Sequence, residues 1–422
     1  MKITNIEVKN FKSFKEEDLK IGDFTILIGA NASGKSNAIS LIRFLSNIMN
    51  YGIDDAVSLM GGIEYIKNTT ANYDENIYFK YVLDFRDDHF QLRRRGPEKG
   101  GINLDEILIE FEIKSYKRGG GYSIEKNNLN ISYSAVENSN SRDPYATYQL
   151  IFTKNRQGCS VKNDSLSNND NFKKMVDEDI EFLNMLKEIY SSKICNGKKE
   201  VYASKIDFLV PGFFDIDNYI KIYDFDAKKI KSSTSILTAK NLVEDGSNVA
   251  NVLKTILKSK EKKRKFLNLL KDLLPFIEEV QVEVNYDKSI SYLIKEKYSN
   301  KNYYSNFLSD GTVNIIAIII ALYFGEQNEF VVLEEPERNL HPQILSKLVS
   351  MAKEVSKSKQ ILITTHNPEL IKNASIDNVM FTKRTHDGVT KLERISENEM
   401  IKQFLKNELG LDDLFVNGFI GI

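Results

Sequence analysis

The chain has 422 residues, and its 58 lysines and arginines nearly balance its 59 aspartates and glutamates, giving a net charge of -1. A chain of this length can form two or three domains, or one domain with a sizeable insertion. The near-neutral balance excludes a global field that would attract nucleic acid or an acidic membrane, so any such contact must come from a local patch.

The cysteines and the apolar runs narrow the class of protein further. Cys159 and Cys195 form no CxxC pair and the four histidines are scattered, so neither a disulfide framework nor a zinc site is encoded. The N-terminus lacks the apolar core of a signal peptide, and the longest apolar run, Val313 to Phe324, is shorter than the roughly 20 residues of a membrane span. We therefore expect a cytoplasmic protein with reduced thiols and no membrane contact.

The first 50 residues follow the order strand, connection, strand, loop and helix. The strands are IEVKNF and FTILIG, and apolar residues then recur at helical spacing from Ile39 to Ile48. From about residue 76 to 155, short β-type runs such as IYFKYVLDF and ILIEFEI alternate with Gly, Asn and Ser clusters. This pattern predicts the start of an α/β layer followed by an antiparallel sheet lobe.

Helical periodicity dominates the middle of the chain. It runs from Asn168 to Lys193 and from Gly246 to Val280, with Pro275 near the end, and no heptad pattern is long enough for a coiled-coil arm. After Asn306 the α/β pattern returns, with a helix after LSDGT, the strand FVVLEEP, a helix, the strand QILITTH, and a final strand and helix. We expect one α/β unit divided between residues 1–160 and 301–422, with a helical or mixed lobe inserted at 161–300.

The stretch GANASGKSN fits the G-x-x-x-x-G-K-[ST] phosphate loop, between a strand and a helix as that motif requires. Its glycines permit a tight loop whose N–H groups converge on phosphate oxygens, at the positive end of the next helix. A glycine-rich turn before an ordinary helix is the alternative. Lys35 is expected to reach the β- and γ-phosphates of ATP and Ser36 to ligate Mg²⁺. The nucleotide-binding residues are then Gly29, Ala30, Asn31, Ala32, Ser33, Gly34, Lys35, Ser36 and Asn37.

Two carboxylates end the apolar run in FVVLEEPERNLHP. A buried strand that delivers two carboxylates at its C-terminal end suits a Mg²⁺ nucleotide site. We assign Glu334 to the metal and Glu335 to the attacking water, with Glu337 as the next candidate for the base. In QILITTHNPEL, His366 ends another apolar strand, where it can hydrogen-bond the γ-phosphate.

The segment NFLSDGT precedes a buried helix. Leu308, Ser309, Asp310 and Gly311 place a hydroxyl and a glycine at the helix N-terminus, which is an anion site and also an ordinary N-cap. Read alone, the segment favours capping. Its place between the phosphate loop, the EE pair and the strand-end histidine reproduces the order of elements of ABC-type ATPases and favours the anion site.

The chain resembles the ABC-type ATPases related to RecF and the chromosome-maintenance ATPases. Within them it looks like the AAA_21-type branch, with overcoming-lysogenization-defect proteins and stand-alone ATPases of bacterial defence operons. The resemblance runs from IEVKNFKSF to LGLDDLF and includes LVEDGSNVANVL, Leu242 to Leu253. It implies an α/β fold: a P-loop ATPase head with a mixed sheet, an antiparallel β lobe and an inserted, mainly helical lobe.

The resemblance also implies a reaction and an assembly. Relatives hydrolyse ATP with Mg²⁺, and their heads pair so that the signature segment of one completes the nucleotide site of the other. Ser309 and Gly311 would face the γ-phosphate of the partner's ATP, and Lys12 would lie near the nucleotide. Departures are Glu334 in place of the usual Asp, and LSDGT in place of LSGGQ. Gln149 is the best candidate for the glutamine loop but stays outside the predicted site.

Three functions remain open at this stage. The first is an ATP-driven homodimer, or larger even-numbered homo-oligomer, that controls an effector in anti-phage defence. Overcoming-lysogenization-defect proteins carry a C-terminal nuclease, and the short remainder after His366 predicts that a nuclease or toxin comes from a neighbouring gene and binds the inserted lobe. The second is a RecF-like repair ATPase, for which the basic clusters at Arg93–Arg95 and Lys260–Lys265 offer DNA contacts, although a solvated loop and a solvated helix face are the favoured interpretation of these clusters. The third is a scaffold that binds ATP and barely hydrolyses it.

Overall fold

The computed structural model describes the whole chain except residues 73, 89–90, 95–100, 117–120, 138–143, 156–157, 169–172, 195–218, 237–240, 326–329, 373, 400, 402–409 and 418–422. Its residues divide into two compact units. Unit 1 comprises Met1–Ile21, Ser36–Tyr219 and Thr385–Leu392, and unit 2 comprises Gly22–Lys35, Ile220–Arg384 and Glu393–Ile422. The predicted boundaries near residues 160 and 300 remain predictions.

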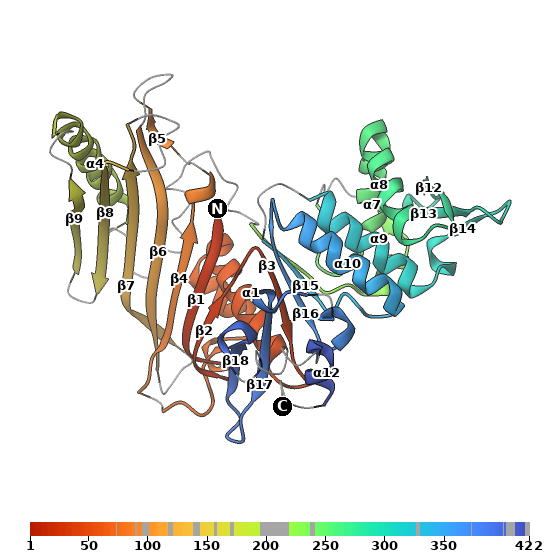
Figure 1. Ribbon diagram of the computed structural model, residues 1–422, viewed down its shortest axis with the longest axis horizontal. Coiled ribbons are helices and arrows are strands. Elements are labelled where there is room, and N and C mark those ends of the chain that lie inside the picture. Colours follow the sequence, from red (N-terminus) through yellow and green to blue (C-terminus); the bar gives the residue numbers. More distant parts are fainter. Residues whose placement is uncertain are drawn as a thin grey trace. The chain divides into compact units, whose positions relative to one another are not determined.

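Unit 1 is built on an eight-stranded sheet with the order β2-β1-β4-β6-β7-β8-β9, in which β5 also pairs with β6 (Figure 1). Every pair in it is antiparallel, which confirms the predicted β lobe. The strands are β1 (Lys2–Phe11), β2 (Phe14–Lys20), β4 (Ile77–Asp84), β5 (Gln91–Arg94), β6 (Gly101–Ser115), β7 (Tyr122–Ala135), β8 (Ala146–Asn155) and β9 (Gly158–Asn168). Its helices are α1 (Lys35–Tyr51), α2 (Ile53–Leu59), α3 (Ile63–Ile66) and α4 (Lys173–Ile194).

Aromatic side chains form the core between α1 and this sheet. Phe79 on β4 stacks on Phe111 of the neighbouring β6 with ring centroids 5.0 Å apart, and Phe44 of α1 lies 5.2 Å from Phe79. All three side chains are fully buried. The alternation of apolar and polar residues along β4 and β6 places these rings on one face, because successive side chains in a strand point to opposite faces. This packing fixes α1 against the sheet.

A second sheet has six strands in the order β10-β15-β16-β3-β17-β18, of which the first five belong to unit 2 and β18 is divided between the units (Figure 1). The strands are β3 (Phe24–Ile28), β10 (Ile220–Tyr223), β15 (Phe330–Glu334), β16 (Gln360–Thr365), β17 (Val379–Arg384) and β18 (Thr390–Arg394). The pairs from β10 through β15, β16 and β3 to β17 are parallel. β3 and β16 are buried at every residue, as continuous apolar runs are when both faces of a parallel sheet are covered. The carboxyl ends of these strands therefore meet at one edge.

The middle of the chain contributes more strand than the sequence predicted. The helical pattern assigned through Val280 ends at Leu273, because Pro275 interrupts it and β12 begins at Ile277. A four-stranded sheet, β11-β13-β12 with β14 on β13, follows these helices. Its strands are β11 (Thr234–Ser235), β12 (Ile277–Val284), β13 (Ser289–Glu296) and β14 (Asn302–Tyr304). The helices of unit 2 are α6 (Ala227–Lys231), α7 (Val249–Lys258), α8 (Lys260–Leu273), α9 (Asp310–Tyr323), α10 (Pro342–Val355) and α12 (Leu411–Val416).

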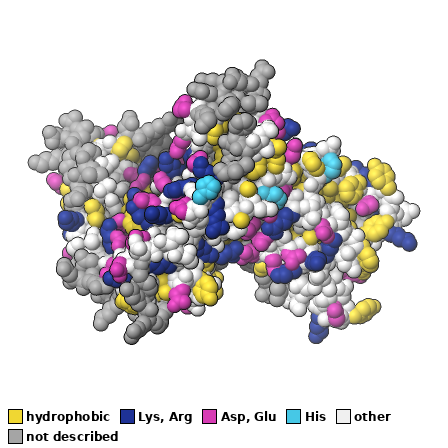
Figure 2. Space-filling model, turned by 90° about the horizontal axis from the view of Figure 1, so that it is seen from below, with side chains coloured by type: hydrophobic (Ala, Val, Ile, Leu, Met, Phe, Trp, Pro, Cys, Tyr) yellow, Lys and Arg dark blue, Asp and Glu magenta, His cyan; other side chains and the backbone are white. Residues whose placement is uncertain are grey.

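Helix α9 forms the centre of the core of unit 2. Every residue from 312 to 322 is buried, so the helix is apolar all round rather than amphipathic. This burial makes α9 a core helix. Of the helices that the structure describes, none combines the length and apolar character needed to cross a bilayer. Basic and acidic side chains are interspersed on the part of the surface coloured in Figure 2, in line with the near-zero net charge.

Removing the side chain of Ile316 should destabilise this core. The residue is 0% exposed, so Ile316→Ala should lower the free energy of unfolding by about 2–5 kcal/mol through lost burial and a residual cavity. Urea titration followed by circular dichroism measures the change. Val416→Ala on α12 is the control, since Val416 is 68% exposed and should change stability by less than about 0.5 kcal/mol. Equal shifts in the two variants would contradict this account of the core.

Candidate functional site

The predicted phosphate loop connects the end of β3 to the start of α1. Its backbone N–H at Gly29 donates to the Thr365 carbonyl at 3.3 Å, which ties the loop to the end of β16. Ala32 and Gly34 lie in the left-handed region with φ of 62° and 114°. A Gly at 34 adopts this conformation without a steric penalty, which explains why the motif requires it.

The first glycine of the loop is required by close packing. A Cβ atom on Gly29 would lie 2.6 Å from the Thr382 carbonyl oxygen, and closer still to the hydroxyl oxygens of Thr382 and Ser33. Those two hydroxyls are hydrogen-bonded to each other at 2.5 Å. The loop is thus held against β17 by a contact that leaves no room for a side chain.

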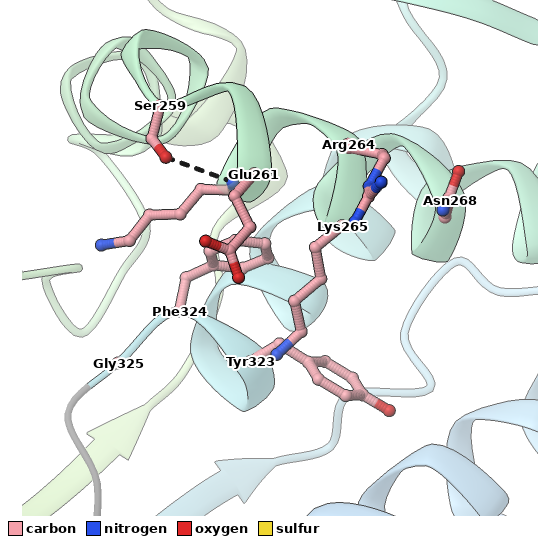
Figure 3. A pocket seen from close by; sticks show the side chains of 9 residues that line it. Ser259, Glu261, Arg264, Lys265, Asn268, Tyr323, Phe324 and Gly325 are labelled. Atoms are coloured by element: carbon pink, nitrogen blue, oxygen red, sulfur yellow. Dashed lines mark hydrogen bonds between the residues drawn. The ribbon is translucent and has the colours of Figure 1, made fainter.

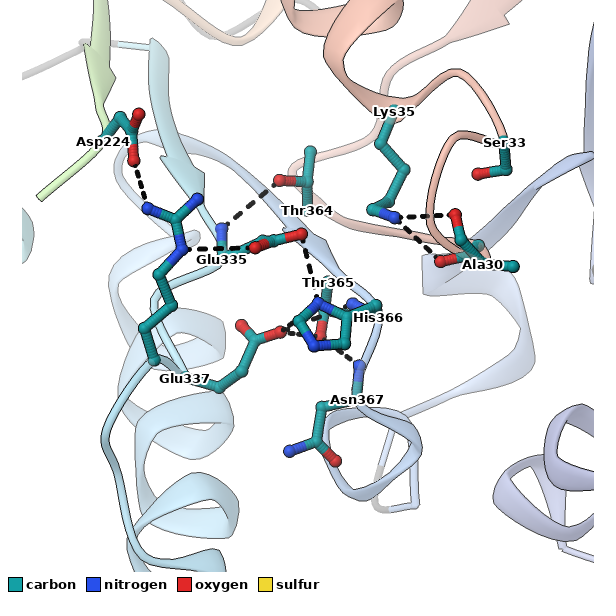
Figure 4. Close-up of polar contacts among 12 residues, drawn as sticks. Ala30, Ser33, Lys35, Asp224, Glu335, Glu337, Thr364, Thr365, His366 and Asn367 are labelled. Atoms are coloured by element: carbon teal, nitrogen blue, oxygen red, sulfur yellow. Dashed lines mark hydrogen bonds and ion pairs between the residues drawn. The ribbon is translucent and has the colours of Figure 1, made fainter.

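Lys35 is folded back into the loop. Its side chain is largely buried, and Nζ donates to the carbonyl oxygens of Gly29 at 2.8 Å and Ala30 at 3.0 Å (Figure 4). Burial lowers the pKa of the ammonium, while the nearby carboxylates of Glu335, Glu337 and Glu334 oppose that shift. An ammonium held by two neutral carbonyls can exchange them for anionic phosphate oxygens, which bind it more strongly.

The residues after Lys35 belong to unit 1. Ser36 and Asn37 open α1, and Asn37 Nδ2 donates to Ser13 Oγ at 2.5 Å. Lys12, in the left-handed region with φ of 48°, donates from Nζ to Ser40 Oγ at 3.1 Å. Burial lowers the pKa of Lys12, and the nearby Arg43 adds to the effect. The NFKSF turn is thus bonded to the first turns of α1.

Glu334 ends β15 and Glu335 follows it. The backbone of Glu335 is left-handed, with φ of 43°, and its N–H donates to the Thr364 carbonyl at 2.9 Å. One carboxylate oxygen lies 3.1 Å from His366 Nδ1, and the other accepts from Arg338 Nε at 3.2 Å (Figure 4). Partial burial alone would raise the pKa of Glu335, but the bonds from His366 and Arg338 outweigh it and lower the pKa. The carboxylate is therefore ionised, as a proton acceptor must be.

Glu337 has the opposite character. Its side chain is 4% exposed, and Thr365 Oγ1 donates to its Oε1 at 2.5 Å. Its Oε2 has no hydrogen-bond partner among the described residues. Burial raises the pKa of this carboxyl, and its bond from Thr365 ties Glu337 to the end of β16.

Two residues of this network were not predicted from the sequence. Arg338 bonds Glu335 and also donates from Nη1 to Asp224 Oδ1 at 2.6 Å. Asp224 directly follows Tyr223, which ends β10 opposite Leu333 of β15. Only the pairing of β10 with β15 brings Asp224 to the strand ends, and no motif spacing in the sequence predicts this position.

The signature segment begins α9 in unit 2. Ser309 Oγ accepts from the Thr312 N–H at 3.1 Å and so caps the helix, while Ser309 itself is exposed and Leu308 is buried. Asp310 is ion-paired with Lys231, a contact that the sequence did not predict. A Cβ on Gly311 would lie 2.6 Å from the Asn339 carbonyl oxygen, so the helix start packs directly on the chain after Arg338. Capping is thus observed, and the exposed Ser309 remains accessible.

The glutamine-loop candidate and two arginines of the first basic cluster lie on strands of the unit 1 sheet. Gln149 is in the middle of β8 and donates to Ser132 Oγ at 3.4 Å, so it is part of a sheet rather than of a loop. Arg93 and Arg94 fall on β5, and Arg95 lies outside the described residues.

The second basic cluster lies on α8, beside a pocket of about 550 Å³ (Figure 3). Lys265 Nζ lies 5.4 Å from the ring centre of Tyr323 in this pocket.

The magnesium ligands predicted from the sequence, Ser36 and Glu334, remain predictions. In the part of the chain that the structure describes, no group of three or more His, Cys, Asp or Glu side chains gathers into a metal site. Mg²⁺ is commonly held by one or two carboxylates or hydroxyls plus substrate phosphates. The side chains of Glu334 and Ser36 each carry oxygen atoms of that kind.

The chain has an SMC-head-like fold. It matches the Smc head bound to the C-terminal winged-helix domain of ScpA with a TM-score of 0.53 and 16% identity, covering 93% of this chain and 97% of that one. It also matches the Smc head with an extended coiled coil from Pyrococcus furiosus with a TM-score of 0.51 and 14% identity, covering 96% and 99%. These likenesses confirm the predicted fold class.

The chain belongs to the AAA_15 family of AAA ATPase domains, which matches residues 1–371. Chromosome partition protein Smc of Methanocaldococcus jannaschii is 26% identical over 276 residues, 64% of this chain and 19% of Smc. Endonuclease GajA of Bacillus cereus is 24% identical over 404 residues, 88% of this chain and 56% of GajA. Septu protein PtuA of Bacillus thuringiensis is 25% identical over 146 residues, which are 30% of this chain and 37% of PtuA. The chain thus spans little more than half of GajA and less of the other two.

Adding one methyl group to the loop should disrupt it. Gly29→Ala places a Cβ 2.6 Å from the Thr382 carbonyl, which cannot move without disturbing β17. We expect a loss of about 1–3 kcal/mol in unfolding free energy from overpacking, together with loss of nucleotide binding. Urea titration and titration with a fluorescent ATP analogue measure the two effects. Gly22→Ala is the control for stability, because a Cβ there would make only ordinary contacts, at 3.7 Å from the Phe24 carbonyl oxygen and 3.8 Å from Thr25 Oγ1. Unchanged nucleotide affinity in Gly29→Ala would contradict the assigned loop.

Proposed function

We propose that this AAA ATPase binds ATP with Mg²⁺ at the loop 29–37 and hydrolyses it with Glu335 as general base. The observation that supports this proposal most strongly concerns the Glu335 carboxylate. It is ionised and is held between Arg338 and His366, at the strand edge where Lys35 also lies. Water attacks the γ-phosphorus as Glu335 accepts its proton, and the bond to the ADP oxygen breaks. The products are ADP and phosphate.

Each side chain of the edge has a role in this scheme. Lys35 leaves the loop carbonyls to pair with the β- and γ-phosphates, and His366 hydrogen-bonds the γ-phosphate. Glu334 and Ser36 hold the magnesium ion, which supplies charge neutralisation at the phosphates. Lys12 contributes a basic group near the nucleotide. Because His366 already contacts Glu335, γ-phosphate binding and the position of the base are linked through one ring.

We further propose that two heads pair around two ATP molecules, in an ABC-type arrangement. The exposed Ser309 and the partly buried Gly311 at the start of α9 support this, since the positive end of a 14-residue helix is suited to the partner's γ-phosphate. The proposed assembly is a homodimer or a larger even-numbered homo-oligomer. In each pair, the signature of one copy would complete the site of the other.

The proposed cellular role is control of an effector in bacterial anti-phage defence. One matched relative is an endonuclease, GajA, and another is the Septu protein PtuA, and these two likenesses support the proposal. The narrower placement in the AAA_21-type, overcoming-lysogenization-defect-like branch is proposed from the sequence motifs alone. The effector would be a nuclease or toxin on another chain, held by the lobe between about residues 160 and 300. ATP would change its hold by shifting the population of the paired heads.

Replacing the base should separate binding from hydrolysis. Glu335→Gln keeps the shape of the side chain but removes the proton acceptor, so we expect unchanged ATP affinity and a loss of about 10²-fold or more in kcat. The ATP-bound dimer should accumulate in sedimentation experiments. Lys35→Ala is the control, because loss of its charge should abolish binding itself. Wild-type turnover in Glu335→Gln would show that the base lies elsewhere.

Co-purification tests the cellular role. Tagged chain expressed from its native operon, as wild type and as Glu335→Gln, should retain a nuclease or toxin in amounts that differ between the two. The difference is expected because the variant is trapped with ATP. Recovery of no partner in either form, together with ATP-dependent binding of gapped DNA by the purified chain, would instead favour the RecF-like repair function.

A further inference from the structure

Arg338 lies between two carboxylates of unit 2. Its Nη1 donates to Asp224 Oδ1 at 2.6 Å, and its Nε donates to Glu335 Oε2 at 3.2 Å (Figure 4). Asp224 comes from the end of β10 and Glu335 from the end of β15, which is the next strand in the sheet. One guanidinium therefore spans two neighbouring strand ends.

Stability alone gives little reason for this arrangement. The side chain of Arg338 is 40% exposed and that of Asp224 is 42% exposed. Ion pairs with this much exposure contribute about 0–1 kcal/mol, because solvent screens them and two side chains must be ordered. Arg338 uses separate nitrogens of its rigid planar group for two different carboxylates, and this geometry restricts where Glu335 can lie.

The backbone of Arg338 is fixed as well. Its N–H donates to the Glu335 carbonyl at 3.2 Å, and its own carbonyl accepts from Asn314 Nδ2 at 3.0 Å. Asn314 is a buried residue of α9, the helix that starts with the signature segment. The next carbonyl, of Asn339, touches Gly311 on the same helix. Arg338 is thus fixed to α9 through its backbone and to Asp224 through its side chain.

We propose that Arg338, anchored by Asp224 and by α9, is the positioning residue that holds the Glu335 carboxylate in line for its proton transfer. The proposal rests on the proposed function of Glu335 as the base. His366 holds the other carboxylate oxygen, but its side chain is 46% exposed and is also the group assigned to the γ-phosphate. When His366 turns to the phosphate, Arg338 is the contact that keeps the base in place. Small errors in the position of a base are costly, since proton transfer requires hydrogen-bond reach.

The test compares Arg338→Ala, Arg338→Lys and Asp224→Asn in steady-state ATP hydrolysis by the full chain. Arg338→Ala should lower kcat about 10-fold or more and leave KM for ATP within about 2-fold, because Glu335 is mispositioned while the phosphate loop is intact. Arg338→Lys should recover part of kcat, as its ammonium can reach one carboxylate but not bridge two. Asp224→Asn should lower kcat less than Arg338→Ala. Lys347→Ala is the matched control, since Lys347 pairs with Asp272 at 3.5 Å on the surface of the same unit and should behave as wild type.

The outcomes separate this inference from the function on which it rests. Wild-type kcat in Arg338→Ala, with Glu335→Gln inactive, overturns the positioning role and leaves Glu335 as the base. Full turnover in Glu335→Gln removes the base assignment and the positioning role with it. A rise in KM in step with the loss of kcat, without recovery in Arg338→Lys, assigns Arg338 to nucleotide binding or to folding and also overturns the proposal.

Discussion

The parallel pairing of β3, β15 and β16 is the constraint on which the candidate site depends. These strands are far apart in sequence, yet their register places Ile28, Glu334 and the Thr364–Thr365 pair at neighbouring strand ends. Parallel strands present their carboxyl ends at one edge. The pairing of the backbones alone therefore brings together the residues that follow each strand. The loop, the carboxylates and His366 then need only short-range bonds to fix their geometry.

Those short-range bonds give two neighbouring carboxyl groups different properties. The pKa of Glu335 is lowered by bonds from an imidazole and a guanidinium, which outweigh its partial burial, whereas burial raises the pKa of Glu337, which accepts a bond from Thr365. Opposite pKa shifts of two nearby carboxyl groups are typical of sites in which the two groups have different acid and base roles. The difference arises from surroundings, because the two residues are separated in sequence only by Pro336.

Much of this architecture could be predicted because the relevant signals are local. The phosphate loop is a contiguous motif, and the continuous apolar runs of β3, β15 and β16 are typical of buried parallel strands. The sheet formed by β11 to β14 was missed, because β12 follows a strongly helical segment with only Leu274, Pro275 and Phe276 between them. Asp224 and Lys231 were missed for another reason. Their partners, Arg338 and Asp310, lie far along the chain, and only the tertiary fold brings them together.

The signature segment shows why capping and anion binding need not be alternatives. Ser309 caps α9 through Thr312, which satisfies one of the free N–H groups of the first turn and leaves others directed outward. Asp310 adds negative charge at the same end, but its ion pair with Lys231 offsets that charge. The helix end can therefore remain attractive to an incoming phosphate although an acidic residue lies in its first turn. Because α9 also bonds the backbone of Arg338, a displacement of this helix by a bound phosphate would act directly on the residue that contacts Glu335.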